Sequence, residues 1–251
     1  MHDGKALQSG TSHYFGDGFS RAFGVQFTDR ENKLRYPFQT SWGTTTRLIG
    51  AIIMTHGDDS GLVLPPAVAP VQVIVIPIAA HKEGVTEKAL EITERIKKVA
   101  RAKCDTGDQS PGWKFAEYEM KGVPLRVEIG PRDIENGCVM IARRDNGEKI
   151  SVPFTEIETK IPELLQAVRD GLYNKALARR EQMTYDATDY SQLKDIADNK
   201  PGFIRAMWCG DQACEDKLKE IAGVTSRCIP FEQEHLSDTC VCCGKKADKL
   251  V

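Results

Sequence analysis

The sequence predicts an α/β protein in three parts, and three observations support this prediction. From Val71 onward, apolar runs alternate with amphipathic helical segments and end in a hairpin, which is typical of an α/β domain with a mixed sheet. The proline-rich segment 64–70 precedes this domain and cannot continue a helix, so it marks a hinge. Six of the eight cysteines lie between Cys209 and Cys243, which predicts a small metal-binding domain. We therefore place the domains at 1–69, 70–182 and 183–251.

The composition is that of an ordinary soluble protein. Of 251 residues, 41% are hydrophobic and 28% are charged, enough to bury real cores. No apolar run approaches the length of a membrane span, and the N-terminus lacks a signal-peptide pattern, so we expect a cytoplasmic protein. The formal net charge of −2 does not favour nucleic acid, so any RNA site must be a local patch.

A strand, turn and helix are predicted at residues 38–57. An extended run ends at Gly43, and hydroxyls at Thr44 to Thr46 can cap a helix. Arg47 falls in the first turn, where its guanidinium and the helix dipole both favour an anion. The alternative is a capped helix with a surface arginine. Gly57 should end the helix, and its apolar positions should form a buried face: Leu48, Ile49, Ile52 and Ile53.

Two shorter segments flank this unit. Phe23, Val25 and Phe27 alternate with other residues, which predicts a strand. Asp58 and Asp59 could hold Mg²⁺, since paired carboxylates suit that ion. The favoured alternative is a helix end followed by a turn with solvated acids.

The α/β domain begins with a continuous β-branched run, Val71–Ile78, as expected of a strand buried on both faces. A helix beginning at Thr86 should bury four positions: Ala89, Ile92, Ile96 and Val99. Pattern alone extends this helix to about Lys103. The later elements are a helix at 113–121, a strand at 123–129, strands at 138–142 and 150–154 joined by a turn at 145–147, and a helix from Pro162 to about Arg180.

The C-terminal part is predicted as a connector at 183–190, helices at 190–197 and 215–221, and strands at 203–208 and 225–230. Its cysteines form two pairs with a long intervening segment, the pattern of a tetrahedral thiolate zinc site. We assign Cys209, Cys214, Cys240 and Cys243, because two residues between the last pair suit a zinc knuckle. Cys242 is the alternative to Cys240, and Cys228 should pack as a small apolar residue. Four protein ligands leave no open position, so the zinc would be structural.

Several motifs carry a resemblance to a known family. SWGTTTR at 41–47 and HGDDSGLVLPP at 56–66 resemble motif 3 of class II aminoacyl-tRNA synthetases, in the version of the archaeal and eukaryotic prolyl-tRNA synthetases. ALQSGTSH at 6–13 resembles another segment of that catalytic domain, and PGWKF and GPRD resemble anticodon-domain motifs. The resemblance implies the C-terminal part of an antiparallel-sheet catalytic domain, an α/β anticodon-binding domain and a small α+β zinc domain. It also implies a short strand at 101–105, where pattern alone continues the helix.

The resemblance also implies roles for individual residues. ATP would be contacted by Gln8, Thr11, Thr45 and Arg47, with Arg47 as the catalytic triphosphate clamp. Proline would be bound by His13, Trp42 and Gly43. Six charged residues would offer donors and acceptors to anticodon bases: Lys114, Glu117, Arg126, Glu128, Arg132 and Asp133. Mg²⁺ would assist Arg47 in neutralising the triphosphate.

The implied activity is ATP-dependent ligation of L-proline to tRNA(Pro) through prolyl-adenylate. Family motifs 1 and 2 are missing, so we expect Met1 to be an internal position of a longer protein and the chain alone to be inactive. The alternative is a non-catalytic tRNA-binding module. A paralogue that has lost activity is disfavoured, because the motif residues are retained together. The full-length family is homodimeric, and we expect this chain to be a weak dimer or a monomer.

Overall fold

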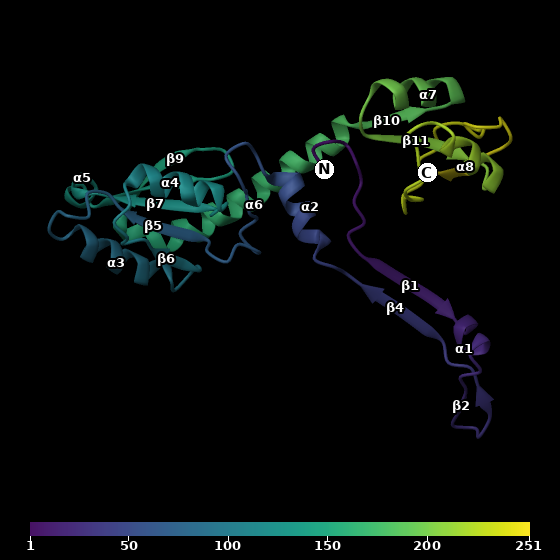
Figure 1. The fold of residues 1–251 in the computed structure, drawn as a ribbon, viewed down its shortest axis with the longest axis horizontal. Helices are drawn as coiled ribbons and strands as arrows, with labels where there is room; N and C mark the ends of the chain where they lie inside the picture. The colour runs from purple at the N-terminus through teal and green to yellow at the C-terminus, as the bar shows by residue number, and fades with distance from the viewer. The chain divides into compact units, whose positions relative to one another are not determined.

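The computed structural model describes residues 1–251 and is mixed α/β, as predicted (Figure 1). Its contacts divide the chain into two compact units. The first comprises Met1 and residues 6–52, and the second comprises residues 2–5 and 53–251. No helix has the length and apolar character that crossing a membrane requires.

The first unit is built on an antiparallel pair of strands, β1 (Thr11–Gly16) and β4 (Gln39–Gly43). Between them lie the helix α1 (Gly18–Ala22) and a small hairpin of β2 (Phe27–Thr28) and β3 (Leu34–Arg35). The only buried residue between positions 6 and 52 is Ser20, whose hydroxyl donates to the Pro37 carbonyl at 2.6 Å. This unit therefore has no hydrophobic core of its own within the chain.

Two sequence predictions fail in this region. The strand predicted across Phe23, Val25 and Phe27 is wrong, because Phe23 caps α1 and only Phe27 enters a strand. The helix α2 (Arg47–His56) forms as predicted, but its apolar face is not buried, and Ile49 is 61% exposed. Helical periodicity identifies an apolar face, and no residue of that face is fully buried in this helix.

The second unit contains a five-stranded mixed sheet in the order β6-β5-β7-β8-β9. Strands β6, β5 and β7 run parallel, whereas β7, β8 and β9 are antiparallel. In chain order, the elements are β5 (Val73–Pro77), α3 (Val85–Ile96), β6 (Ala102–Cys104), α4 (Pro111–Met120), β7 (Leu125–Ile129), α5 (Pro131–Glu135), β8 (Cys138–Arg143), β9 (Lys149–Pro153), the 3-10 turn Phe154–Glu156 and α6 (Ile157–Gln182). This confirms the mixed sheet and the short strand that the family resemblance implied near 101–105.

Helices cover both faces of this sheet (Figure 1). On one face, α3 and α6 pack against the alternating residues Val73, Val75 and Val127. On the other face, Phe115 and Tyr118 of α4 pack against residues of β5. Strand β5 is buried along its whole length, as its continuous apolar run predicts.

The sequence predicted that the last helix of the α/β domain begins at Pro162. In the structure this helix, α6, begins five residues earlier, at Ile157. Ile157 and Ile161 are both fully buried, so the packing of this additional turn against the sheet outweighs the hydrogen bond that Pro162 cannot donate. A proline near the start of a helix is an ambiguous boundary for this reason.

The segment 58–70, predicted to contain a hinge, is attached to the α/β sheet domain. The Arg101 guanidinium donates to the carbonyls of Pro66, Ala67 and Ala69 at 2.8 to 3.2 Å. Gly61 has φ +128°, and a Cβ there would lie 2.5 Å from the Met120 Cα, so only glycine fits. The predicted boundary at residue 69 stays a prediction, but the proline-rich segment itself is fixed.

The C-terminal region has a three-stranded sheet in the order β10-β11-β12. Its elements are β10 (Thr184–Ala187), α7 (Tyr190–Asn199), β11 (Phe203–Trp208), α8 (Gln212–Lys219) and β12 (Lys249–Leu250). The prediction of a connector at 183–190 is wrong, because β10 pairs with β11 in parallel. The strand predicted at 225–230 is also wrong, because this segment pairs with no strand.

Candidate functional site

The residues expected to bind ATP and proline gather on the β1–β4 ladder of the first unit. Thr11 lies opposite Gly43, and His13 lies opposite Ser41. Directly opposed residues share a face, so Thr11, His13 and Gly43 lie on one face of the pair. Trp42 lies opposite Ser12 and belongs to the other face, where it is 81% exposed. The ladder thus brings together only part of the set expected to bind proline.

Two of the residues expected to contact ATP, Thr45 and Arg47, lie at the start of α2. The Thr45 hydroxyl accepts from the Arg47 amide at 3.3 Å, and the Thr44 hydroxyl donates to the Ser9 carbonyl at 3.2 Å. The second bond ties the loop next to Gln8 to the helix start. Arg47 is exposed at this helix N-terminus, an arrangement that suits an anion.

Lys114, expected to contact tRNA, is instead an internal anchor. It is 2% exposed, and its ammonium donates to the carbonyls of Asp105 at 2.9 Å and Gly107 at 2.7 Å. It also pairs with the Asp105 carboxylate at 3.3 Å. Burial alone would raise the pKa of Asp105, but bonds from the Gly107 amide, Lys114 and Tyr118 lower it overall. Burial, and then the hydrogen bond to the same carboxylate, raise the pKa of Tyr118 to about 12.

Arg126 is the centre of a charged network beside α4. Its guanidinium donates to Glu119 and to Glu128, both at 3.0 Å, and lies 4.0 Å from the centroid of the Phe115 ring. Lys149 pairs with Glu128 at 3.1 Å. Sequence reasoning found Arg126 and Glu128 but missed Glu119 and Lys149. Phe115 and Glu119 are four residues apart on α4, so they share a helix face, and Arg126 contacts both of them. This spacing is a sequence signal that could have identified Glu119 as a member of the network.

The other charged candidates do not join this network. Glu117 pairs with Lys121, one turn along α4. Asp133 accepts from the Gly130 amide at 2.8 Å and so caps the short helix α5, on which Arg132 is exposed. The six residues therefore belong to separate hydrogen-bonded groups.

Asp58, considered for Mg²⁺, is held by an arginine. Its carboxylate accepts two bonds from Arg144, at 2.7 and 2.6 Å, and a third from the Ser60 amide. The Arg144 bond is the main reason that the pKa of Asp58 is lowered. This carboxylate is engaged in an ion pair, which is neither a metal site nor a freely solvated acid.

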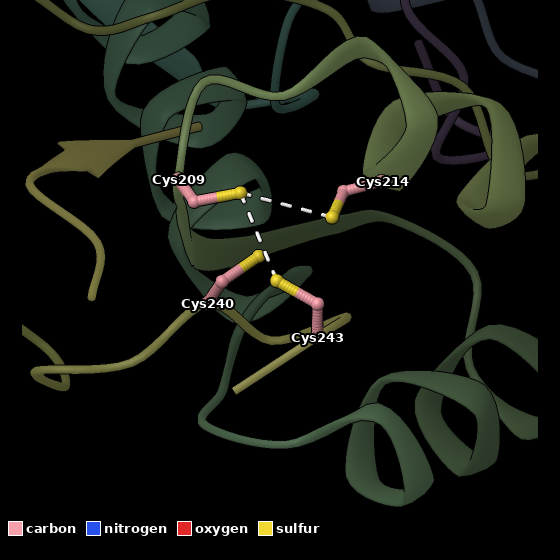
Figure 2. A group of neighbouring side chains, drawn as sticks. All are labelled: Cys209, Cys214, Cys240 and Cys243. Carbon is pink, nitrogen blue, oxygen red and sulfur yellow. Dashed lines mark hydrogen bonds between the residues drawn. The ribbon is translucent and has the colours of Figure 1, made fainter. Parts of the chain in front are cut away.

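Four cysteines from three parts of the C-terminal region point their sulfur atoms toward one another (Figure 2). Cys209 follows β11, Cys214 lies in the first turn of α8, and Cys240 and Cys243 flank a tight turn. All four sulfurs lie within 4.8 Å of one another.

The spacing of these sulfurs fits a metal better than a disulfide. The Cys209 sulfur lies 3.7 Å from that of Cys214 and 3.8 Å from that of Cys243. A tetrahedron with zinc–sulfur bonds of about 2.3 Å has edges of about 3.8 Å. Gly244, with φ +72°, supplies the left-handed residue that closes the turn after Cys243. This group could hold a metal ion.

The environment of Cys240 favours a thiolate. Burial acts to raise its pKa, but the backbone amides of Cys242, Cys243 and Cys209 donate to its sulfur, and its pKa is lowered to about 7. Burial raises the pKa of Cys214. Cys242 packs among the apolar residues of this region and lies outside the four-cysteine group.

Comparison with known proteins agrees with this architecture. An anticodon binding domain model matches residues 72–164, and a model of the prolyl-tRNA synthetase C-terminal domain matches residues 190–251. The chain is 62% identical over its whole length to the proline--tRNA ligase of Clostridium novyi, of which it covers 52%. It is 62% identical to that of Lachnospira eligens, of which it covers 53%. A crystal structure of Cryptosporidium parvum prolyl-tRNA synthetase, complexed with L-proline and AMP, matches 98% of the chain at 43% identity and a TM-score of 0.91, with 53% of that chain covered.

The mixed sheet with its anticodon-domain match defines the chain as part of the aminoacyl-tRNA synthetase class. Within this class, the sequence identities and the match of the cysteine-rich region both point to the enzymes for proline. The chain belongs to the prolyl-tRNA synthetase family. It spans about half the length of the curated relatives it matches.

Proposed function

We propose that this chain supplies the motif 3, anticodon-binding and C-terminal parts of a proline–tRNA ligase. The observation that carries the proposal is the 0.91 TM-score match over 98% of the chain to a synthetase solved with L-proline and AMP. The reaction would join proline and ATP into prolyl-adenylate and then transfer the prolyl group to the 3′ end of tRNA(Pro), in the cytoplasm. The complete enzyme would act as a homodimer.

In this reaction, the first unit would bind the small substrates. Gln8, Thr11 and Thr45 would contact ATP, and Arg47 would stabilise the triphosphate charge as pyrophosphate leaves. Thr11, His13 and Gly43 share a ladder face, which supports a common site for adenylate and proline. Trp42 would line it only from the other face of the ladder. Mg²⁺, when bound with ATP, would neutralise further phosphate charge.

Arg126 and Glu128 are proposed to read anticodon bases together with Glu119 and Lys149. Their network holds donors and acceptors side by side against an aromatic ring, which suits a guanine edge. Of the other candidates, Arg132 is exposed and can also contact a base. Glu117 would first have to release Lys121, and Asp133 would have to release the Gly130 amide. Lys114 would act indirectly, by holding the loop before α4.

The four cysteines are proposed to bind Zn²⁺ as a structural ion. The sulfur spacing and the amides around Cys240 support this assignment. Binding would be coupled to folding, since the C-terminal core is small and the ligands come from three segments.

Two measurements test the proposed function. Proline-dependent ATP–pyrophosphate exchange should be seen with a version extended upstream to the length of the curated relatives and be absent from the 251-residue chain. In that extended version, Arg47→Ala should reduce exchange at least about 100-fold, the size of effect seen when one charge-stabilising group is removed. Exchange that is independent of proline would contradict the proposal.

A non-catalytic tRNA-binding module is the second candidate, and one observation favours it for the chain in isolation. Residues 6–52 contain no buried hydrophobic residue, whereas the α/β and C-terminal regions each have a core. This candidate predicts tRNA(Pro) binding by the chain without exchange activity. Failure of the extended version to catalyse exchange, alongside retained tRNA binding, would select it.

A further inference from the structure

A group of basic side chains lies where α6 passes the end of α2. We define it as the junction cluster: His2, His56, Lys175 and Arg179. Arg179 donates to the Thr55 carbonyl at 3.1 Å, and the His2 amide donates to the Met54 carbonyl at 3.3 Å. Lys175 and Arg179 are four residues apart on α6, so they share one helix face.

None of the four side chains in this cluster forms an ion pair with an acid. The pKa of His56 is lowered by burial and then by Arg179, His2 and Lys175. The pKa of His2 is lowered by burial and then by Arg179. Lys175 lies near enough to Asp58 to lower its pKa, but that carboxylate is already held by Arg144. Like charges four residues apart on a helix are mutually repulsive, so this group favours an added anion.

The two α6 cations have donors to spare. Arg179 has five N–H donors and uses one of them on Thr55, and Lys175 is exposed and makes no ion pair. Beyond Leu172, α6 has no buried residue, so its last turns present their side chains to solvent. Lys175 lies about 15 Å along the helix from Leu165, which is in the sheet-domain core.

We propose that the junction cluster binds the phosphodiester backbone of tRNA, at a position away from the bases read by Arg126. This inference rests on the proposed function for the identity of the RNA. Backbone phosphates are the anions that a tRNA-binding protein must meet outside the anticodon, and Lys and Arg are the side chains that neutralise them. The contact would position the RNA without selecting its sequence.

The test uses the full chain and two tRNA transcripts, one for proline and one with an unrelated anticodon. Binding is measured at several salt concentrations for the wild type and for Lys175→Ala. Loss of one phosphate contact should weaken binding of both transcripts about tenfold at 0.1 M salt and make the log–log salt slope shallower by about one. Lys160→Ala is the matched control, because Lys160 lies on the same helix and pairs with Glu163. It should leave both quantities unchanged.

A second variant guards against a loss of fold. Arg179→Lys keeps the charge but loses the planar guanidinium, and we expect it to keep the salt slope. Unchanged affinity and slope in Lys175→Ala would overturn the proposal, as would an effect confined to the proline transcript, which would indicate base recognition. If the wild type binds the two transcripts equally, the proposal that the Arg126 network reads anticodon bases is refuted. The effect of Lys175→Ala still tests the proposed contact with backbone phosphates. Binding of neither transcript would refute both proposals.

Discussion

Replacing Lys114 with methionine separates a structural role from an RNA-binding role. Methionine keeps the length and much of the volume of the side chain, but it removes the ammonium. The Asp105 carboxylate and two carbonyl groups would then lose the donor that now lies within 2.7 to 3.3 Å of them. Because the lysine is 2% exposed, water cannot replace that donor without a local rearrangement.

The expected cost follows from the number and kind of bonds. Each hydrogen bond from a charged donor contributes about 1.5–3 kcal/mol, and breaking a buried ion pair by removing one partner costs about 3–5 kcal/mol. We therefore expect Lys114→Met to lower the free energy of unfolding of the α/β domain by about 3–5 kcal/mol. With a urea m-value of about 2 kcal/mol per molar, the midpoint should fall by roughly 2 M.

The assay exploits the distribution of tryptophans. The three tryptophans, Trp42, Trp113 and Trp208, lie one in each predicted domain. Urea unfolding followed by Trp113 fluorescence, in a reference protein carrying Trp42→Phe and Trp208→Phe, reports the α/β domain. Lys121→Met is the control, since that exposed lysine also forms one ion pair on α4 and should cost no more than about 1 kcal/mol.

The reasoning would be refuted by a specific result. If Lys114→Met changes the unfolding free energy by less than about 1 kcal/mol while tRNA affinity falls, the lysine acts on RNA and its internal bonds are incidental. If Lys114 anchors the 105–110 loop, the variant should lose both unfolding free energy and tRNA affinity. Its affinity should then return under conditions in which the variant is fully folded.

Three further results are expected. Arg95 lowers the pKa of Glu158 to about 2, from an ordinary value of 4.5. The stabilisation of the fold by this ion pair is therefore complete above about pH 4.5 and is lost as the pH falls toward 2. Glu158→Gln should therefore flatten the dependence of the urea midpoint on pH in that window, and an unchanged slope would contradict the assignment. Arg101→Ala should cost about 1–2 kcal/mol and speed amide exchange in residues 66–72, whereas slow exchange there would show that the segment is held by other contacts. Chelation, or Cys214→Ser, should remove one equivalent of zinc and unfold the region reported by Trp208, while Cys242→Ser should retain the metal.

Where a segment's burial is decided by its own pattern, the sequence was a sufficient guide. The β-branched run at Val71–Ile78 predicted a strand buried on both faces, and β5 is that strand. The mostly apolar run Phe203–Trp208 was predicted as a strand, and β11 has the same bounds. Local pattern failed where pairing depends on distant partners, as in β10, which becomes a strand only because β11 lies parallel to it across α7.

The candidate site divides in the same way. Sequence alone selected the four cysteines that the structure gathers, because ligand type and spacing are local properties of the chain. It could not tell that Lys114 points inward and Arg126 anchors a network, since a charged residue has the same sequence signal whether it is solvated, buried or paired. It also placed Trp42 with His13, although strand register puts them on opposite faces.

The sequence by itself thus determined the family, the five strands of the α/β sheet in their order along the chain and the group of four cysteines, all of which are set by residue type and by spacing along the chain. Only the tertiary structure decided which charges face each other. The junction cluster joins His2 and His56 to Lys175 and Arg179 across more than a hundred residues. Electrostatic interaction depends on distance in space, and packing brings these groups together after the chain has folded.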